Sequence, residues 1–430
     1  MPLQHPLRAV TGGVLLIAIA SLGALASWRL RITPLAERLV HDTNALLGAE
    51  HPRPSHVTPA RPGSFAMAVA PLLPELARVY ENAKALDEEQ RSRCEAVADG
   101  TASLSALPAE CRAALERHRP LMQRVLEATH ADQGGLPEEL WLQPVQNDRL
   151  PTEEPVILFQ MVRHAALEAR FQLADGHVEA AVDTCLDALA LSREIALGGL
   201  IGQMLSVNGY RVAYRACADA IDAAPARRKR QAAAQLVRLG EGFPPLSLSL
   251  RQESVIVQFS EFRELMPDEW VEELAPSARD LLNPEKPLAD EDLSKGWQWP
   301  LRRQVAWHHK VEGFGKLEAI ADLPPTARRK AFAVLETRES AAWLQVGRPS
   351  VGQYGQYADR LDLRRLRNDA LIALAEVDAT RAETGQWPRE LPNGMSSLIM
   401  EPVGPNELVL KPCGTSLAEY ALHVTADTQP

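Results

Sequence analysis

The sequence predicts a mostly α-helical protein with a body of helical hairpins, one apolar helix near the N-terminus and a small α+β piece at the C-terminus. Hydrophobic residues make up 46% of the chain but aromatic residues only 5%. Ala and Leu, which enter helices at little cost, are frequent among the hydrophobic residues. A charge-free run lies near the N-terminus, and a strongly amphipathic segment lies near the C-terminus. The 430 residues are enough for more than one core.

The run from Ala9 to Trp28 carries no charged residue. Because a helix rises about 1.5 Å per residue, about 20 apolar residues span a bilayer core of ~30 Å. We therefore expect residues 1–32 to form a single-pass inner-membrane anchor, with the body in the periplasm. Cleavage as a signal peptide near Ala26, which would release a secreted protein, is one alternative. A cytoplasmic body is the other, favoured by the basic residues Arg29, Arg31 and Arg38.

A stalk and a spacer are expected over residues 33–63. The apolar positions between Thr33 and Leu47 follow helical spacing and predict a stalk helix. Prolines are frequent from His51 to Gly63, and they favour extended backbone over helix. We interpret this stretch as a semi-rigid spacer between membrane and body.

Residues 64–350 are expected to form the helical body. Its best-defined hairpin joins Val156–Ala174 to Val178–Leu191 through a turn at Gly176. The other expected helices are Phe65–Leu86, Glu88–Asp99, Pro108–His130, Gly198–Ala223, Gln231–Leu239, Ser249–Leu265, Trp297–Ile320 and Pro325–Val346.

The second helix of that hairpin resembles the second half of a tetratricopeptide repeat. Small residues stand where two helices would approach closely, and apolar residues stand at the contacts: Ala180, Ala181, Ala188, Val182 and Leu189. The sequence shows one such unit and no array at a fixed period, so a repeat-like hairpin inside a larger body is expected rather than a solenoid.

Residues 351–430 are expected to hold an amphipathic helix and a small β hairpin. The helix is predicted over Leu361–Thr384, preceded by a loop at Gly347–Tyr357 and stopped by Gly385 and Pro388. Two short strands are predicted at Glu407–Lys411 and Tyr420–Val424.

The end of this helix resembles the C-terminal module of a group of uncharacterised bacterial envelope proteins. In that group a long helix ends in a Gly-x-Trp-Pro turn followed by a small sheet. The matching stretch is Ala370–Leu391, with Glu376, Arg381, Gly385, Trp387, Pro388 and Leu391 as its main positions. The resemblance implies an envelope location and an architecture, but no activity.

The net charge of −10 argues against a nucleic-acid partner, which would need a basic face. Five cysteines are too few for a disulfide scaffold. Cys94 and Cys111 are one possible bridge and Cys185 and Cys217 are possible neighbours on adjacent helices, while buried or free thiols are the alternative. No residue pattern predicts a cofactor or a metal ion. His308 and His309 are adjacent, so they point in different directions.

Two basic clusters and a set of tryptophans are candidate contacts for a protein partner. The clusters follow prolines at expected helix starts, where cations oppose the helix dipole. A solvated turn or core packing explains the same residues without a partner. The candidates are Arg227, Arg228, Lys229, Arg230, Arg328, Arg329, Lys330, Trp297, Trp299 and Trp307.

The sequence therefore predicts a membrane-anchored envelope scaffold or protein-interaction protein without an identifiable catalytic site. The alternative is a cell-wall-acting enzyme. The stretch from Arg251 to Ser260 resembles lytic transglycosylases, in which a Glu followed by Ser works as general acid/base. That resemblance implies Glu253 as the acid, although the segment after Ser260 departs from the family pattern.

Overall fold

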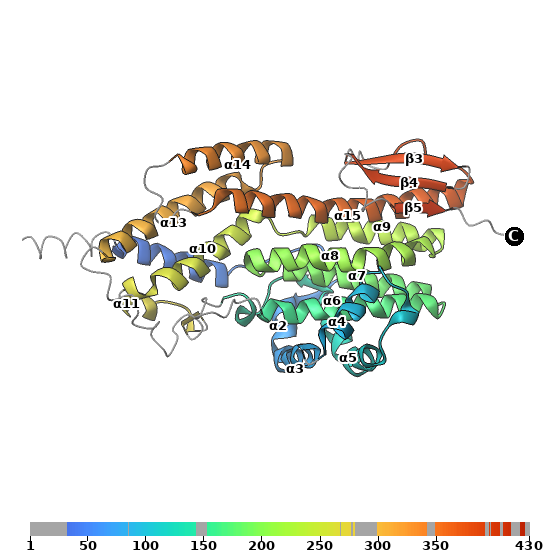
Figure 1. The fold of residues 1–430 in the computed structure, drawn as a ribbon, viewed down its shortest axis with the longest axis horizontal. Helices are drawn as coiled ribbons and strands as arrows, with labels where there is room; N and C mark the ends of the chain where they lie inside the picture. The colour runs from blue at the N-terminus through green and yellow to red at the C-terminus, as the bar shows by residue number, and fades with distance from the viewer. Residues whose placement is uncertain are drawn as a thin grey trace, which may run out of the picture.

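The computed structural model describes residues 32–425 except 85, 143–152, 267, 277, 280–298, 342–348, 392–394, 396, 405–406 and 414–421. Most of them are helical, as the sequence predicts. The molecule is elongated, and its longest helices run close to the long axis (Figure 1). Among the described residues, no helix is both long and apolar enough to cross a membrane. The expected anchor at residues 9–28 lies outside the described residues.

The centre of the molecule is a layer of long helices around one large apolar core. They are α6 (Glu153–Ala174), α7 (Val178–Ile195), α8 (Gly199–Asp222), α9 (Ala226–Glu241) and α15 (Val351–Thr384). The α6–α7 hairpin turns at Gly176, whose φ of 79° is the left-handed conformation that glycine adopts without strain. Helix α7 packs against α6 and α8, and α15 packs against α8 and α9.

The small-residue positions of the hairpin are mostly buried. Ala181, Val182, Ala188 and Leu189 are fully enclosed, whereas Ala180 is exposed. On the next helix, a Cβ added at Gly209 would lie 2.3 Å from Ser192 Oγ of α7. Glycine at that position therefore sets how closely α7 and α8 approach.

A second group of helices projects from one flank of α6. It contains α2 (Phe65–Val69), α3 (Leu73–Lys84), α4 (Glu88–Ala98) and α5 (Ala109–Ala128). In Figure 1 these blue and cyan helices lie below the central layer. The single helix expected over Phe65–Leu86 is interrupted at Pro71 and Pro74, where the chain forms α2, a short 3-10 turn and α3.

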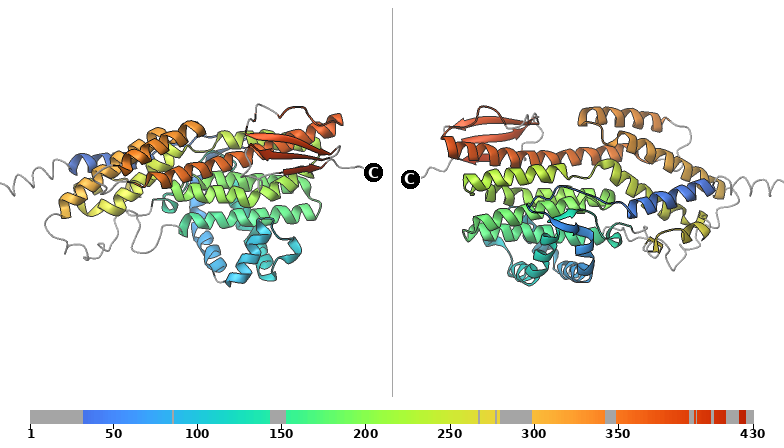
Figure 2. Two further views of the ribbon diagram at one scale, coloured as in Figure 1. Left: turned by 45° about the horizontal axis from the view of Figure 1, so that its top comes forward. Right: turned by 180° about the vertical axis from the view of Figure 1, so that it is seen from behind.

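A second, smaller core lies at the opposite end of the molecule from the C-terminal sheet (Figure 2). It is formed by α10 (Leu246–Phe262), α13 (Trp299–Ala321), α14 (Pro325–Ser340) and the first halves of α8 and α15. Helix α11 (Asp268–Glu272) lies nearby. Helix α15 begins at Val351, inside the stretch expected to be a loop. In that helix a Cβ at Gly352 would lie 2.3 Å from Glu336 Oε1 of α14, so a larger residue there would require the Glu336 side chain to move.

The C-terminal sheet packs against the last turns of α15. Its antiparallel strands are β3 (Leu398–Gly404), β4 (Glu407–Pro412) and β5 (Leu422–Thr425), in that order. The sequence predicted β4 and β5 but not β3. Helix α15 ends at Gly385, with a φ of 74°, and Arg381 lies over the ring of Trp387, 5.4 Å from its centroid.

The stretch expected to be a free stalk and spacer is part of the body instead. Residues 32–47 are helical, and Leu35, Leu39 and Val40 are buried in the large core. The side chain of Asn44 donates to the Glu273 carbonyl and accepts from Ala275 N. Further along, β1 (Arg61–Ser64) pairs in parallel with β2 (Ala131–Gln133). The apolar face of the helix over residues 32–47 and the backbone pairing of β1 with β2 explain why this stretch folds onto the body.

Residues 51–57, which we name the strap, lie against β2, the end of α5, α7 and α9. Prolines leave carbonyl oxygens without neighbouring N–H donors, and arginines of the body use them as acceptors. Arg193 donates to the Pro54 carbonyl, and Arg238 donates to the carbonyls of Ser55 and His56. Arg53 of the strap forms a buried ion pair with Glu194, at 2.7 Å.

Candidate functional site

The basic cluster at the start of α9 is used inside the chain. Arg228 is buried and pairs with Asp183 of α7 at 2.5 Å. Lys229 is also buried and pairs with Asp378 of α15. Arg230 pairs with Glu383 at 2.9 Å and with Glu376. Of the four, Arg227 is exposed. The cluster therefore joins α9 to α7 and α15, and it is not the solvated turn considered above.

The cluster at the start of α14 has the same character. Arg328 is buried and pairs with Asp362 of α15 at 2.6 Å, and Arg329 pairs with Asp359 at 2.8 Å. Lys330 is exposed. Both arginines fasten α14 to α15, so Lys330 and Arg227 are the members of the two clusters that remain candidates for contact with a partner.

The three tryptophans do not form one surface. Trp307 is fully buried, stacks on Phe262 with ring centroids 5.5 Å apart, and donates from Nε1 to Gln258 Oε1 at 2.8 Å. Core packing therefore explains Trp307. Trp299 begins α13, and Trp297 lies outside the described residues.

Glu253 lies on α10 where α8, α13 and α15 meet. Burial raises the pKa of its carboxyl to about 7, and the nearby Lys310 opposes that rise. A pKa near neutrality suits a general acid. The cavity beside α10, however, is lined by Arg251, Ser254 and Gln258 on another face of the helix, and not by Glu253.

A cavity of about 560 Å³ lies between α3, α4, α5 and α6. Its volume lies in the range of about 300–1,000 Å³ typical of ligand sites. The walls are mainly apolar, and charged side chains stand around them. The lining includes the side chains of Arg91, Glu95, Glu110, Ala113, Ala114 and Arg117.

A histidine pair lies at the wall of this cavity. The rings of His118 on α5 and His164 on α6 have centroids 5.5 Å apart. Burial lowers the pKa of His164 to about 3 and also lowers that of His118, with nearby arginines adding to both effects. The Nδ1 atoms of both rings are buried without a hydrogen-bond partner among the described residues. Both imidazoles are therefore neutral at pH 7.

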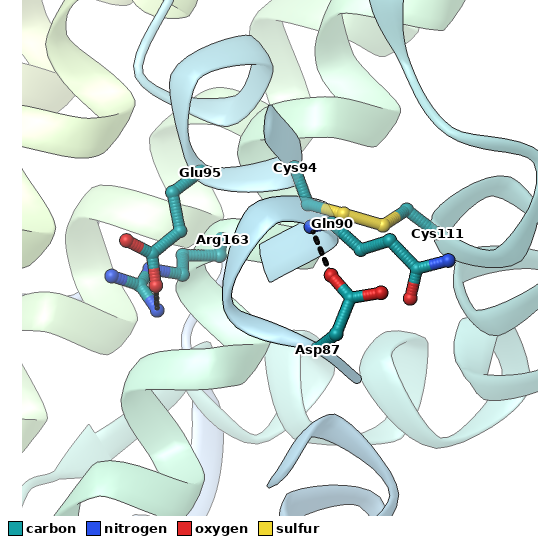
Figure 3. Close-up of a disulfide and its surroundings, with 6 residues drawn as sticks. All are labelled: Asp87, Gln90, Cys94, Glu95, Cys111 and Arg163. Carbon is teal, nitrogen blue, oxygen red and sulfur yellow. Dashed lines mark hydrogen bonds and ion pairs between the residues drawn. A yellow bond between two sulfur atoms is a disulfide. The ribbon is translucent and has the colours of Figure 1, made fainter. Parts of the chain in front are cut away.

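The other wall carries a disulfide and an ion pair (Figure 3). Cys94 of α4 is bonded to Cys111 of α5. Next to it, Glu95 accepts from Arg163 of α6 at 2.8 Å. Asp87 caps α4 by accepting from Gln90 N at 2.7 Å. These bonds fix α4 between α5 and α6, so the cavity has a rigid frame. The other cysteine pair, Cys185 and Cys217, consists of buried neighbouring thiols.

A second cluster of chemistry-bearing side chains lies under the strap. His56 Nε2 donates to Asp187 Oδ1 at 2.7 Å, and His130 Nε2 donates to the same oxygen at 2.8 Å. Burial lowers the pKa of His56, whereas the hydrogen bond to Asp187 raises that of His130. Burial alone would raise the pKa of Asp187, but the two hydrogen bonds bring it below its ordinary value. The carboxylate is therefore ionised.

Sequence reasoning found neither site. His118 and His164 belong to no metal-binding or catalytic motif in the sequence, and His56 lies in the stretch that was predicted to be a spacer. The cluster members are 131 and 57 residues from Asp187, so no local spacing brings them together. The sequence feature that could have pointed to the histidine cluster is the predicted hairpin, because it places Asp187 next to the apolar core positions of α7.

Comparisons of this chain with protein-family models, curated proteins and solved structures found no match. The cavity, the histidine cluster and Glu253 are therefore interpreted from their geometry and chemistry.

Proposed function

We propose that this protein is a membrane-anchored envelope scaffold that binds a protein partner through the cavity between α3, α4, α5 and α6. The observation that carries the proposal is that cavity: a mainly apolar hollow of about 560 Å³ on a flank that projects from the central layer (Figure 1). Apolar pockets with a few charged groups at the edge fit the side chains that anchor protein interfaces.

The chemistry of the cavity indicates what kind of segment it accepts. Neutral, desolvated histidines line its wall, so a charged group placed against them would lose hydration without gaining a counter-charge. Exposed charges of both signs stand at its edge, at Arg91, Arg117 and Glu110. A partner segment with an apolar or aromatic side chain between polar neighbours matches this pattern.

The proposed location is the periplasmic side of the inner membrane. The Cys94–Cys111 disulfide supports it, because disulfides persist in oxidising compartments and are rare in the cytosol. The run from Ala9 to Trp28 supports the anchor. The helix–Gly-x-Trp-Pro end of α15, followed by a small sheet, supports kinship with bacterial envelope proteins.

The test is site-specific photo-crosslinking in intact cells, with the crosslinking amino acid at position 113 and, as a control, at position 334. Ala113 lines the cavity, and Val334 is 69% exposed on the distant helix α14. We expect one defined adduct from position 113 that Ala114→Trp, which fills the cavity, abolishes and Val334→Trp does not. Adducts that are equal at both positions, or that survive Ala114→Trp, would reject the cavity as the binding site.

A second candidate function, the cell-wall lyase with Glu253 as general acid/base, is favoured by the pKa of about 7. Its test is release of soluble fragments from purified peptidoglycan. Glu253→Gln should abolish that release, while Glu241→Gln, an exposed carboxylate at the end of α9, should not change it. Activity that persists in Glu253→Gln, or that is missing from the wild-type protein, excludes this role.

A further inference from the structure

We propose that His56, His130 and Asp187 form a binding site for a divalent transition-metal ion, with Zn²⁺ as the best fit. Among the described residues, these three side chains offer ligand atoms that all lie within 4.8 Å of one another. The rings of His56 and His130 meet at 70°, with centroids 5.3 Å apart, and both Nε2 atoms point at the same carboxylate. Two imidazole nitrogens and a carboxylate oxygen therefore converge on one point.

This donor set matches zinc rather than the hard cations. Zn²⁺ prefers imidazole nitrogen at about 2.0–2.1 Å and carboxylate oxygen at about 2.0–2.2 Å, whereas Ca²⁺ and Mg²⁺ prefer all-oxygen sites. Tetrahedral bonds of that length hold ligand atoms about 3.3 Å apart. The present separations of 2.7 and 2.8 Å from Asp187 Oδ1 need to widen by about half an ångström.

The site has one open side. The side chain of His56 is 1% exposed and that of Asp187 16%, whereas that of His130 is 29% exposed. Water therefore reaches the cluster from the His130 side. Three protein ligands with a solvent-filled fourth position are the arrangement of catalytic zinc sites rather than of closed structural ones.

The surrounding contacts hold the ligands in place before a metal ion binds. Ser55 Oγ donates to the His130 carbonyl at 3.0 Å, so the residue next to one ligand is bonded to another ligand. Arg238 donates to the His56 carbonyl at 2.8 Å. Asp187 is fixed by its position within α7. Such outer contacts orient metal ligands and strengthen binding.

Charges of both signs face the site. Arg193 near His56 shares the carboxylate of Glu194 with Arg53 of the strap, at 2.9 and 2.7 Å, so these three side chains carry one net positive charge. His130 faces Arg61 and Glu127, which are both more than half exposed and lie 3.8 Å from each other. Asp187 supplies the negative charge that a bound cation would contact directly.

The experiment is metal titration of the purified, tag-free full-length protein after chelator treatment, by calorimetry with Zn²⁺ and by elemental analysis. We expect one equivalent of Zn²⁺ with a Kd of micromolar or tighter. Asp187→Asn and His130→Gln should each weaken binding at least tenfold. His177→Gln, an exposed histidine on the same helix hairpin, and Cys413→Ser, an exposed cysteine outside the disulfide, should leave binding unchanged.

A spectroscopic readout keeps the proposal testable if the ligand variants do not fold. Co²⁺ added to the wild-type protein should give the intense visible absorption of a low-symmetry tetrahedral site, and zinc-edge X-ray absorption should show two imidazoles and no sulfur ligand. Less than stoichiometric binding, binding lost in Cys413→Ser, or sulfur in the zinc shell would overturn the proposal. The cluster would then be a hydrogen-bonded clamp that only holds the strap.

Discussion

Buried ionisable side chains make this protein sensitive to pH at identifiable positions. His164 is the clearest case, because burial keeps its pKa at about 3 in the folded state. The unfolded chain binds a proton near pH 6.5, and the folded protein does not until about pH 3. The stability that neutral His164 contributes is therefore fully present above pH 6.5 and is lost as the pH decreases from 6.5 towards 3.

We expect His164→Leu to reduce this acid sensitivity. Between pH 7 and pH 4.5 the wild-type protein should lose about 2 kcal/mol more free energy of unfolding than the variant, since one uncharged buried imidazole accounts for up to 1.4 kcal/mol per pH unit. Urea unfolding at the two pH values measures the difference. His177→Gln, on the surface, is the control. Equal acid sensitivity in wild type and His164→Leu would contradict the assignment.

The charged side chains that the sequence marked as candidate contacts illustrate what sequence alone leaves open. A run such as Arg227–Arg230 shows where charge is concentrated, but not which residues face inward. Arg228 and Lys229 face acidic residues that lie 45 and 149 positions away in the sequence. Only the packing of α9 against α7 and α15 distinguishes these from Arg227.

Helices were the best-predicted features, because apolar periodicity and helix breakers are local signals. The turn at Gly176 and the stop at Gly385 are both where glycine predicted them, and both glycines adopt left-handed backbone. The start of α15 and strand β3 were missed. Gly352 and Gly355 indicate a loop in isolation, but they lie in a helix that packs along α14, with Glu336 and Phe332 as their nearest neighbours. Sequence patterns do not contain such contacts.

The ion pair between α9 and α15 gives a prediction about how these helices are joined. Lys229 and Asp378 are both 7% exposed, so removing one leaves the other desolvated without its counter-charge. Lys229→Met should lose about 3–5 kcal/mol of stability, whereas the double variant Lys229→Met/Asp378→Leu should lose much less. Chemical unfolding of the two single variants and the double variant measures the coupling.

The surface pair Arg329–Asp359 provides the matched control for the Lys229 and Asp378 variants. Its side chains are 58% and 53% exposed, so Arg329→Met should change stability by less than about 1 kcal/mol. A similar loss in Arg329→Met and Lys229→Met, or a double variant as unstable as Lys229→Met, would show that burial of the α9–α15 pair is not what matters.

The disulfide between α4 and α5 is expected to stabilise the frame of the cavity. It closes a loop with a sequence separation of 17, and cross-links of this size contribute about 2–4 kcal/mol, largely by restricting the unfolded chain. Cys94→Ser/Cys111→Ser should lower the thermal midpoint, and a reductant should bring the wild-type protein to the same value. Cys413→Ser should melt like the wild type. A wild-type midpoint that does not respond to a reductant under unfolding conditions would contradict this role.

The molecule as a whole has two cores joined along α15. The larger core holds residues of α2 to α10, α15 and the C-terminal sheet, and the smaller one holds residues of α10, α13 and α14 with the first halves of α8 and α15. The sequence indicated more than one core from length alone, but it placed residues 33–63 outside the body. Prolines predicted extended backbone there, and the strap is indeed not helical. Extended backbone can be a spacer or a bound segment, and only the tertiary contacts of Arg53, Arg193 and Arg238 decide between them.

Truncation tests whether the strap and the preceding helix belong to the body. Removing residues 1–31 should leave the urea midpoint of the remaining chain nearly unchanged, because every contact of residues 32–63 described above is retained. Removing residues 1–63 should destabilise it strongly, because Leu35 and Leu39 leave the core and Glu194 loses Arg53 while buried. Equal midpoints for the two truncations would restore the spacer interpretation.

The attachment of the strap also determines how the body is held relative to the bilayer. If residues 9–28 span the membrane, the helix over residues 32–47, which is packed in the core, follows after only a few residues. The connection is then too short to let the body reorient relative to the bilayer. The body would then have a fixed distance and orientation relative to the bilayer, instead of moving on a flexible tether. The cavity between α3, α4, α5 and α6 would then be held at a fixed distance from the membrane surface.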